Sequence, residues 1–443
     1  MDVLRVVSSA GAIGIFGGGV TGKAVAKFCE NRGIRYKVFD EFFGEDRRFS
    51  EDEAAKYPLV VRSPSFMSHH EWVKIAGFNG CRCLTELEFA SCFWHGKIVA
   101  VTGTNGKTTT VEFIEHALRL CGKKAVSCGN IGKTFVEVVD SGFNVDGGLA
   151  VVEVSSFQME GSTVFHPDYV LWTNFADDHL DAHGGLLEYF RCKAKLINAV
   201  RGTYSGKTCC FVGKSVDDFA RQSKADDVFG KYVVCTSWDA LPKDSALNTD
   251  AQRENFALVQ KFWQYAGLQV ESLQSAAATF RLPPHRLQRV AKISKGDGAA
   301  VEFWNDSKAT NFHALNGALK SFIEPVILIA GGKSKGEPID GFLKIIRGKV
   351  KALLLIGTIS RELCEAVMDD QDMGSLLICK VFDKNNSPEE VMEAVVRHAF
   401  SLATDGDIVL LSPGFSSLDW FESYEERGKF FEDSVFCLSL ANE

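Results

Sequence analysis

The chain has 443 residues, which is enough for about three domains at roughly 150 residues each. Hydrophobic residues make up 46% and charged residues 24%, so the chain can build several cores and is not intrinsically disordered. The 49 basic and 57 acidic residues give a net charge of −8. This balance argues against broad nucleic-acid binding but allows a local basic pocket for a small anion, so we expect no nucleic-acid partner.

We expect a cytoplasmic protein that does not associate with membranes. No apolar run reaches the ~18 residues that a membrane-spanning helix needs. The stretch from Val3 to Phe16 is interrupted by Arg5 and leads into a glycine loop, which favours a first strand over a signal peptide. The thirteen cysteines are scattered without a C-x-x-C pair, as is typical of thiols in a reducing cytosol. We do not interpret the one loose metal-like grouping as a zinc site. Its members are Cys81, Cys83, Cys92 and His95.

Short β-branched runs alternate with helical patterns along the whole chain, which predicts parallel α/β sheets. We divide the chain into three α/β domains, at residues 1–94, 95–283 and 284–443. The first and third are predicted to be Rossmann-like, and the central one to be a P-loop ATPase-like domain. Strands are expected at 12–16, 36–40, 59–62, 98–102, 149–154, 169–175, 300–304, 326–330, 351–356, 376–382 and 408–412. Helices are expected after the loop at 17–22 and at 109–120, 253–265 and 271–280, and Ser387-Pro388-Glu389-Glu390 predicts a further helix start.

The strongest chemical signal is the sequence GTNGKTT, which lies between a predicted strand and a predicted helix. Its glycines let the backbone wrap a phosphate closely, and the helix adds its positive end. Lys107 supplies a cation for the terminal phosphates, and Thr108 offers a hydroxyl to Mg²⁺. The loop is shorter than G-x-x-x-x-G-K, and the alternative is a glycine turn with an incidental lysine. The predicted ATP-binding residues of this loop are Gly103, Thr104, Asn105, Gly106, Lys107, Thr108 and Thr109.

Three further motifs carry weaker signals. The G-x-G-x-x-G from Gly17 to Gly22, followed by Asp40, indicates a dinucleotide site or merely a tight turn between a strand and a helix. Glu153 at the end of a buried strand is a natural Mg²⁺ ligand, whereas the spacing alone favours a structural role for His179. In the third domain, charged side chains lie at the ends of predicted strands, where α/β sheets bind ligands, or in linkers, although each could be an ordinary solvated charge. They are Arg286, Asp306, Lys308 and Lys335.

Taken together, these residues resemble the Mur ligase family. The matching stretches span nearly the whole chain in order: GGGVTG, VTGTNGKTTT, GNIG, VVEVSSFQME, TNFADDHLDAHG, LPPHRLQ, NDSKATN, AGGKSKG and LSPGFSSLDWFESYEERGKFF. The resemblance is to the members that add D-glutamate to UDP-N-acetylmuramoyl-L-alanine for peptidoglycan precursor synthesis. It implies three small-molecule substrates, which are this UDP-sugar, D-glutamate and ATP, with Mg²⁺ as cofactor, and we expect a monomer.

The resemblance also implies a role for individual residues. The UDP-substrate would be held by Gly17, Gly19, Val20, Thr21, Gly22, Asp40, Ser63, Asn130 and Ser156. ATP would be held by the loop 103–109 and by Asn255, Arg286 and Asp306. Mg²⁺ would be ligated by Thr108, Glu153 and His179, which replaces the structural reading of His179. D-Glutamate would be held by Lys308, Thr310, Lys335, Ser417, Leu418 and Tyr424.

The family also carries a carbamylated lysine that bridges metals, and two lysines compete for this position. We choose Lys193, with Lys195 as the alternative, and expect Lys107, Lys193 and His179 to be the catalytic residues. The chain departs from the family pattern at four places, which affects the expected adenine and glutamate contacts. They are Ser65 after Ser63-Pro64, Ala251-Gln252, Gly414-Phe415-Ser416, and Tyr424 in place of a phenylalanine.

The implied chemistry is transfer of the γ-phosphoryl group to the alanine carboxylate, followed by attack of the glutamate amine on the acyl phosphate. The rival hypotheses are a sister ligase for another amino acid, folylpolyglutamate synthetase, an NAD-dependent dehydrogenase and a nucleotide-gated switch without turnover. The dehydrogenase leaves the loop with Lys107 unexplained, and folylpolyglutamate synthetase lacks a UDP-type first domain.

Overall fold

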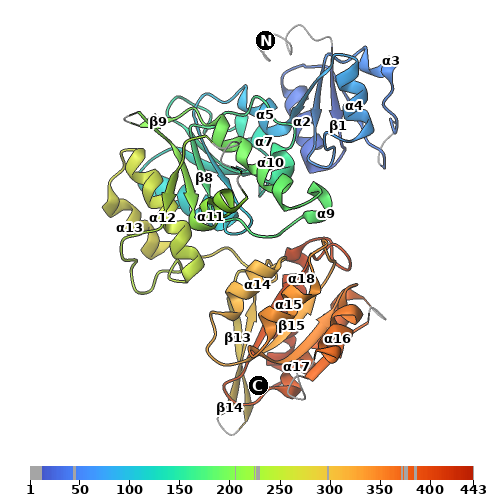
Figure 1. The fold of residues 1–443 in the computed structure, drawn as a ribbon, viewed down its shortest axis with the longest axis vertical. Helices are drawn as coiled ribbons and strands as arrows, with labels where there is room; N and C mark the ends of the chain where they lie inside the picture. Colours follow the sequence, from blue (N-terminus) through green and yellow to red (C-terminus); the bar gives the residue numbers. More distant parts are fainter. Residues whose placement is uncertain are drawn as a thin grey trace. The chain divides into compact units, whose positions relative to one another are not determined.

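The computed structural model describes residues 12–42, 46–204, 206–223, 225, 230–296, 299–370, 373, 378–383 and 387–442 (Figure 1). The described chain forms two compact units. The first runs up to Phe175 and continues with Leu187–Arg281, and the second combines Ala176–Leu186 with Leu282 onward. Three main sheets, two in the first unit and one in the second, confirm the predicted α/β class. The domain boundaries at residues 94 and 283 stay predictions.

The first sheet has four parallel strands in the order β2-β1-β3-β4. They are β1 (Ile13–Phe16), β2 (Tyr36–Phe39), β3 (Leu59–Arg62) and β4 (Arg82–Thr85). Helix α2 (Val20–Asn31) follows β1 and buries Val25, Phe28 and Cys29 on one face, as its spacing predicts. The remaining helices are α3 (Glu51–Ala54), α4 (Glu71–Phe78) and α5 (Glu86–Ser91).

The second sheet has six parallel strands in the order β12-β11-β8-β5-β7-β6. They are β5 (Lys97–Thr102), β6 (Ala125–Gly129), β7 (Leu149–Glu153), β8 (Tyr169–Trp172), β11 (Cys210–Gly213) and β12 (Val233–Cys235), beside a hairpin of β9 (Thr203–Tyr204) and β10 (Lys207–Thr208). The helices are α6 (Lys107–Leu120), α7 (Phe135–Val139), α8 (Ser156–Met159), α10 (Leu186–Ala199), α11 (Lys214–Gln222), α12 (Asp250–Tyr265) and α13 (Val270–Thr279). Because β5 lies between β7 and β8, the carboxyl ends of all three strands meet at one edge.

The third sheet, in the second unit, has the order β13-β14-β18-β15-β16-β17. Its strands are β13 (Gln288–Gly296), β14 (Ala299–Asn305), β15 (Val326–Gly331), β16 (Val350–Ile356), β17 (Ile378–Val381) and β18 (Ile408–Gly414). Only the pairing of β13 with β14 is antiparallel among these described strands. The helices are α9 (Leu180–His183), α14 (Phe312–Leu319), α15 (Ile339–Ile346), α16 (Ser360–Asp369), α17 (Pro388–Leu402) and α18 (Tyr424–Leu440). Positions 376 and 377 of the predicted strand 376–382 lie outside the described residues.

Among the described helices, none combines the length and the apolarity that crossing a bilayer requires.

Candidate functional site

The loop between β5 and α6 has a backbone that only glycine accommodates at two points. Gly103 has φ +147° and Gly106 has φ +79°. A Cβ atom on Gly103 would lie 1.9 Å from Thr173 Oγ1, and one on Gly106 would lie 2.4 Å from Asn255 Nδ2. These close contacts pack the loop against the end of β8 and against α12. The loop therefore has the form of a cradle at the N-terminus of α6, where backbone N–H groups favour an anion.

The end of β8 fixes the tip of this loop through hydrogen bonds. The backbone N–H of Asn105 donates to Asn174 Oδ1 at 2.9 Å, and Asn174 Nδ2 donates to Asn105 O at 3.1 Å. Thr173 Oγ1 also donates to Asn105 O, at 2.6 Å. Rigid support of this kind pre-organises a phosphate site before a ligand arrives. Neither Thr173 nor Asn174 was among the predicted site residues, because nothing in their spacing from the loop indicates contact.

Lys107 places its ammonium group on the loop itself. Its Nζ donates to Gly103 O and to Thr104 O, both at 2.8 Å. The cation is therefore already located at the cradle, as expected for a group that neutralises phosphate charge.

Glu153, Thr108 and Asn130 form a cluster of oxygen and amide groups next to the loop. Thr108 Oγ1 donates to Glu153 Oε2 at 2.8 Å, and Asn130 Nδ2 donates to Glu153 Oε1 at 3.2 Å. Glu153 is 3% exposed, and its partners among the described side chains are these two neutral groups. A buried carboxylate beside a hydroxyl, with no described cation bound to it, fits the hard oxygen ligands that Mg²⁺ prefers.

The buried side of the loop is covered by Lys193 on α10. This side chain is 1% exposed, its Nζ donates to Gly103 O at 3.0 Å, and it lies 4.7 Å above the ring of Tyr189. Lys195 is only partly buried and, two residues further along a helix with 100° per residue, projects in a different direction. Of the two lysines, it is therefore Lys193 that contacts the phosphate loop.

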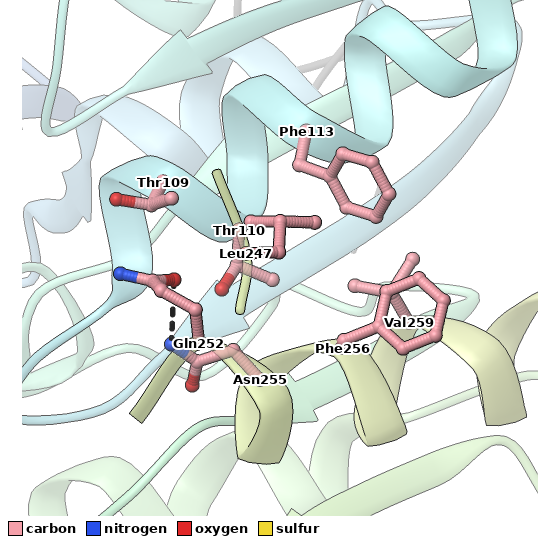
Figure 2. Close-up of a pocket in the computed structure, with 8 residues that line it drawn as sticks. All are labelled: Thr109, Thr110, Phe113, Leu247, Gln252, Asn255, Phe256 and Val259. Carbon is pink, nitrogen blue, oxygen red and sulfur yellow. Dashed lines mark hydrogen bonds between the residues drawn. The ribbon is translucent and has the colours of Figure 1, made fainter. Parts of the chain in front are cut away.

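A small cavity lies between α6 and α12, next to the loop (Figure 2). Its volume of about 10 Å³ matches roughly one water molecule. The residues that line it are Thr109, Thr110, Phe113, Leu247, Gln252, Asn255, Phe256 and Val259. Asn255 Nδ2 donates to Gln252 Oε1 at 3.4 Å, so one of the positions that departs from the family pattern contacts the residue expected to face adenine. The side chain of Ala251 lies outside the described residues.

The glycine loop of the first sheet is hydrogen-bonded to Asp40 and packs closely against Ser63. The backbone N–H of Gly18 donates to Asp40 Oδ2 at 2.5 Å, and that of Phe42 donates to Asp40 Oδ1 at 2.9 Å. A Cβ atom on Gly17 would lie 2.2 Å from Ser63 Oγ, and one on Gly22 would lie 1.7 Å from Gly17 O. Gly19, Val20 and Thr21 form the start of α2, whose N-terminus has no side-chain cap. Three predicted residues, Gly17, Asp40 and Ser63, thus come together, and Ser65 Oγ lies 3.3 Å from Ser63 Oγ.

In the second unit, the carboxylate of Asp178 lies close to three polar side chains. Its Oδ1 pairs with Lys335 Nζ at 2.9 Å and lies 3.7 Å from His179 Nε2, and its Oδ2 accepts from Asn311 Nδ2 at 3.2 Å. His179 has a left-handed backbone with φ +52° directly before α9. Because His179 belongs to the second unit and Glu153 to the first, a metal site shared by them stays a prediction.

The other predicted residues of the second unit lie in the segments that follow β14 and β18, except for Arg286, which precedes β13, and Tyr424, which begins α18. Asp306 follows β14 and accepts from Leu287 N at 3.1 Å and from Ser412 Oγ at 2.8 Å, and burial raises its pKa to about 7. Lys308 Nζ lies 4.7 Å above the ring of Tyr424, the residue that replaces a phenylalanine. Ser417 is buried, whereas Leu418 is 63% exposed. Arg286 and Thr310 flank these groups in sequence, and the roles of all seven residues in binding stay predictions.

Sequence reasoning missed Arg427, which joins the loops of this region. Its fully buried guanidinium donates to Ser307 O at 2.8 Å, to Ser307 Oγ at 3.1 Å and to Phe415 O at 3.2 Å. Burial lowers the pKa of Arg427 to about 9. It lies in the run ESYEERGK, where its charged neighbours give no signal that one arginine is buried.

Comparison with known proteins identifies related families and relatives. The model of the Mur ligase middle domain matches residues 101–260, and that of the Mur ligase, glutamate ligase domain matches residues 285–415. The chain is 31% identical to the UDP-N-acetylmuramoylalanine–D-glutamate ligase of Aquifex aeolicus, over 95% of this chain and 97% of the relative. It is also 31% identical to the ligase of the same name from Chlamydia caviae, over 95% and 96% of the two chains.

Solved structures share the fold at low sequence identity. A pseudomurein peptide ligase type C from Methanothermus fervidus has a TM-score of 0.58 and 16% identity, over 96% of this chain and all of the other. MurF ligase from Thermotoga maritima, solved in complex with ADP, has a TM-score of 0.55 and 14% identity, over 98% and 97% of the two chains.

Proposed function

Because the chain belongs to the Mur ligase family, we propose that it joins D-glutamate to UDP-N-acetylmuramoyl-L-alanine with cleavage of ATP to ADP and phosphate. The product would be a peptidoglycan precursor. The observation that carries this proposal is the cradle of Gly103 to Lys107, with the Thr108–Glu153 pair beside it. This site is built for a phosphorylated ligand and a hard cation, which an amide-forming ligase driven by ATP requires.

The reaction must first activate a carboxylate, which otherwise resists attack by an amine. A carboxylate oxygen of the alanyl group bonds to the γ-phosphorus of ATP, the bond to ADP breaks, and an acyl phosphate forms. The amine nitrogen of D-glutamate then attacks the carbonyl carbon, loses a proton, and expels phosphate. Lys107 and the N-terminus of α6 stabilise the charge on the transferred group, and the rest of the rate gain comes from positioning.

Thr108 and Glu153, with His179 from the second unit, would hold Mg²⁺, which neutralises phosphate charge when bound. Lys193 would be carbamylated, because a neutral amine that takes up carbon dioxide becomes an anion suited to a dication. The burial of Lys193 and its contact with Gly103 support this choice over Lys195. The contacts expected of the UDP-sugar, adenine and D-glutamate, a monomeric state and a cytoplasmic location belong to the same proposal.

A panel of amino acids tests the proposal. Purified protein is incubated with ATP, Mg²⁺ and UDP-N-acetylmuramoyl-L-alanine, and phosphate release is followed with each amino acid in turn. We expect release that requires both the UDP-sugar and D-glutamate. Release with a different amino acid would indicate a sister ligase. In a parallel assay with added NAD, a change in NADH absorbance without phosphate release would indicate a dehydrogenase.

A further inference from the structure

The loop that carries Lys335 also holds a buried carboxylate, Glu337. This residue is 7% exposed, and its Oε2 accepts the backbone N–H of Lys335 at 2.9 Å. Its Oε1 is buried and has no hydrogen-bond partner among the described residues. Burial raises the pKa of Glu337, whereas backbone hydrogen bonds from Lys335 and Glu337 and the charge of Lys335 oppose the rise, and the charge of Asp178 adds to it. Leaving half of a buried carboxylate without a donor is costly, and such groups usually have a function.

The ammonium group on the same loop does not bond to this oxygen, because Lys335 Nζ pairs with Asp178 Oδ1 at 2.9 Å. The loop of Glu337 lies against the loop that follows β18, since Lys333 N donates to Ser416 O at 2.8 Å and Ser416 N donates to Lys333 O at 3.1 Å. Glu337 therefore shares a loop pair with Lys335 and Ser417, two of the residues expected to bind the amino-acid substrate.

The charges of that expected site are incomplete for an amino acid. D-Glutamate carries two carboxylates and one ammonium group. Lys308 and Lys335 supply cations for carboxylates, and Thr310, Ser417 and Tyr424 supply hydroxyls, but none of these five residues supplies an anion for the ammonium group. Asp178, the carboxylate beside Lys335, is already bonded to Lys335 Nζ and to Asn311 Nδ2. A buried ammonium group needs an acceptor, most effectively a charged one.

We propose that Glu337 Oε1 is the acceptor for the α-ammonium group of the incoming amino acid. This inference rests on the proposed function and adds to it the residue that distinguishes an amino acid from a plain dicarboxylate. In this role Glu337 touches the substrate and holds the amine end, while the lysines hold the carboxylates.

Comparing D-glutamate with glutarate, its analogue without the amine, distinguishes binding of the ammonium group by Glu337 from a structural role of this residue. Glu337→Gln keeps the side-chain shape and the acceptor for Lys335 N–H but removes the charge. We expect the KM for D-glutamate to rise at least about tenfold, as for a lost charged hydrogen bond. The inhibition constant of glutarate, which has the same carbon chain and no amine, should change less than about twofold, because glutarate makes no contact with Glu337. Asp340→Asn, on the exposed first turn of α15, is the matched control and should change neither constant.

Other outcomes overturn the inference. Equally weakened binding of D-glutamate and glutarate would show a structural role for Glu337. An unchanged KM for D-glutamate and an unchanged inhibition constant of glutarate would show that Glu337 does not contact the amine. If Glu337→Gln does not fold, Glu337→Asp keeps the charge at a shorter reach and should raise only the KM for D-glutamate. Failure of the proposed function is distinct, because the unmodified protein would then not turn over D-glutamate. The same pair of constants would in that case be measured with the amino acid that it does use and with the analogue of that acid lacking the amine.

Discussion

Removing the ammonium group of Lys107 tests the proposed phosphate-binding role of the loop from Gly103 to Lys107. Lys107→Ala should lower kcat by about 10³-fold or more, because the transferred phosphoryl group loses its fixed cation. The loop should keep its form, since its remaining hydrogen bonds come from the end of β8. Turnover and the melting temperature should be compared with those of Lys123→Ala, an exposed lysine just after α6. Near-normal turnover in the Lys107 variant would contradict the assignment.

Carbamylation of Lys193 has its own chemical signature. Protein equilibrated with ¹³C-bicarbonate should show one carbamate carbon in its NMR spectrum, because the buried amine next to Gly103 O is held in place to react. Lys193→Ala should remove this signal together with most activity, and Lys195→Ala should retain both. A signal that disappears only in the Lys195 variant would assign the modification to the alternative lysine.

Site residues could be predicted from the sequence where a chemically suitable side chain lies at the carboxyl end of a predicted strand. Thr108 follows β5 and Glu153 ends the neighbouring parallel strand β7, and the structure places their oxygens 2.8 Å apart. Residues that act from a distance in sequence were not predictable in this way. Arg427 and Glu337 are buried for reasons of tertiary packing, and single charged residues in polar stretches carry no periodic signal of burial.

At the scale of elements, Glu86 links two helices through a buried carboxyl group. It lies in the first turn of α5 and accepts the N–H of Val136, in the first turn of α7, at 2.6 Å. Burial raises the pKa of Glu86 to about 7, above its ordinary value of 4.5. Between these values the folded protein keeps a proton that the unfolded chain loses, so folding is favoured at low pH and this contribution is lost as pH rises through about 7.

Glu86→Gln should remove this pH dependence. Between pH 5 and 8, the stability of the unmodified protein should fall relative to the variant by on the order of 1–3 kcal/mol. Thermal melts of both proteins across this range measure the difference. A difference that stays constant, or that grows in favour of the unmodified protein as pH rises, would contradict a raised pKa.

Many elements with a strong apolar pattern were predicted, but β11 was missed although its four residues are all buried. The buried runs of β5, β15, β16 and β18 follow from their continuous apolar sequences, and the capping box of Ser387 and Glu390 is confirmed at the start of α17. Strand β13 was missed because most of its side chains are exposed, which leaves little hydrophobic alternation in QRVAKISKG.

At the scale of the whole molecule, the residues assigned to one reaction come from both units. Lys107, Glu153 and Lys193 belong to the first, whereas His179 and Lys335 belong to the second. The sequence did not predict that residues 176–186 belong to the second unit although the segments on both sides of them belong to the first. The cause is local, because Asp178 bonds to Lys335 and Asn311 of the second unit.

The central claim is that a carboxylate of the UDP-sugar is phosphorylated by ATP and then joined to D-glutamate. The most direct test uses UDP-N-acetylmuramoyl-L-alanine with ¹⁸O at both oxygens of its alanyl carboxylate. Mass spectrometry should find one ¹⁸O atom in each phosphate released, together with one ADP and one D-glutamyl product. Phosphate without ¹⁸O, or ADP formation without that product, would contradict the account.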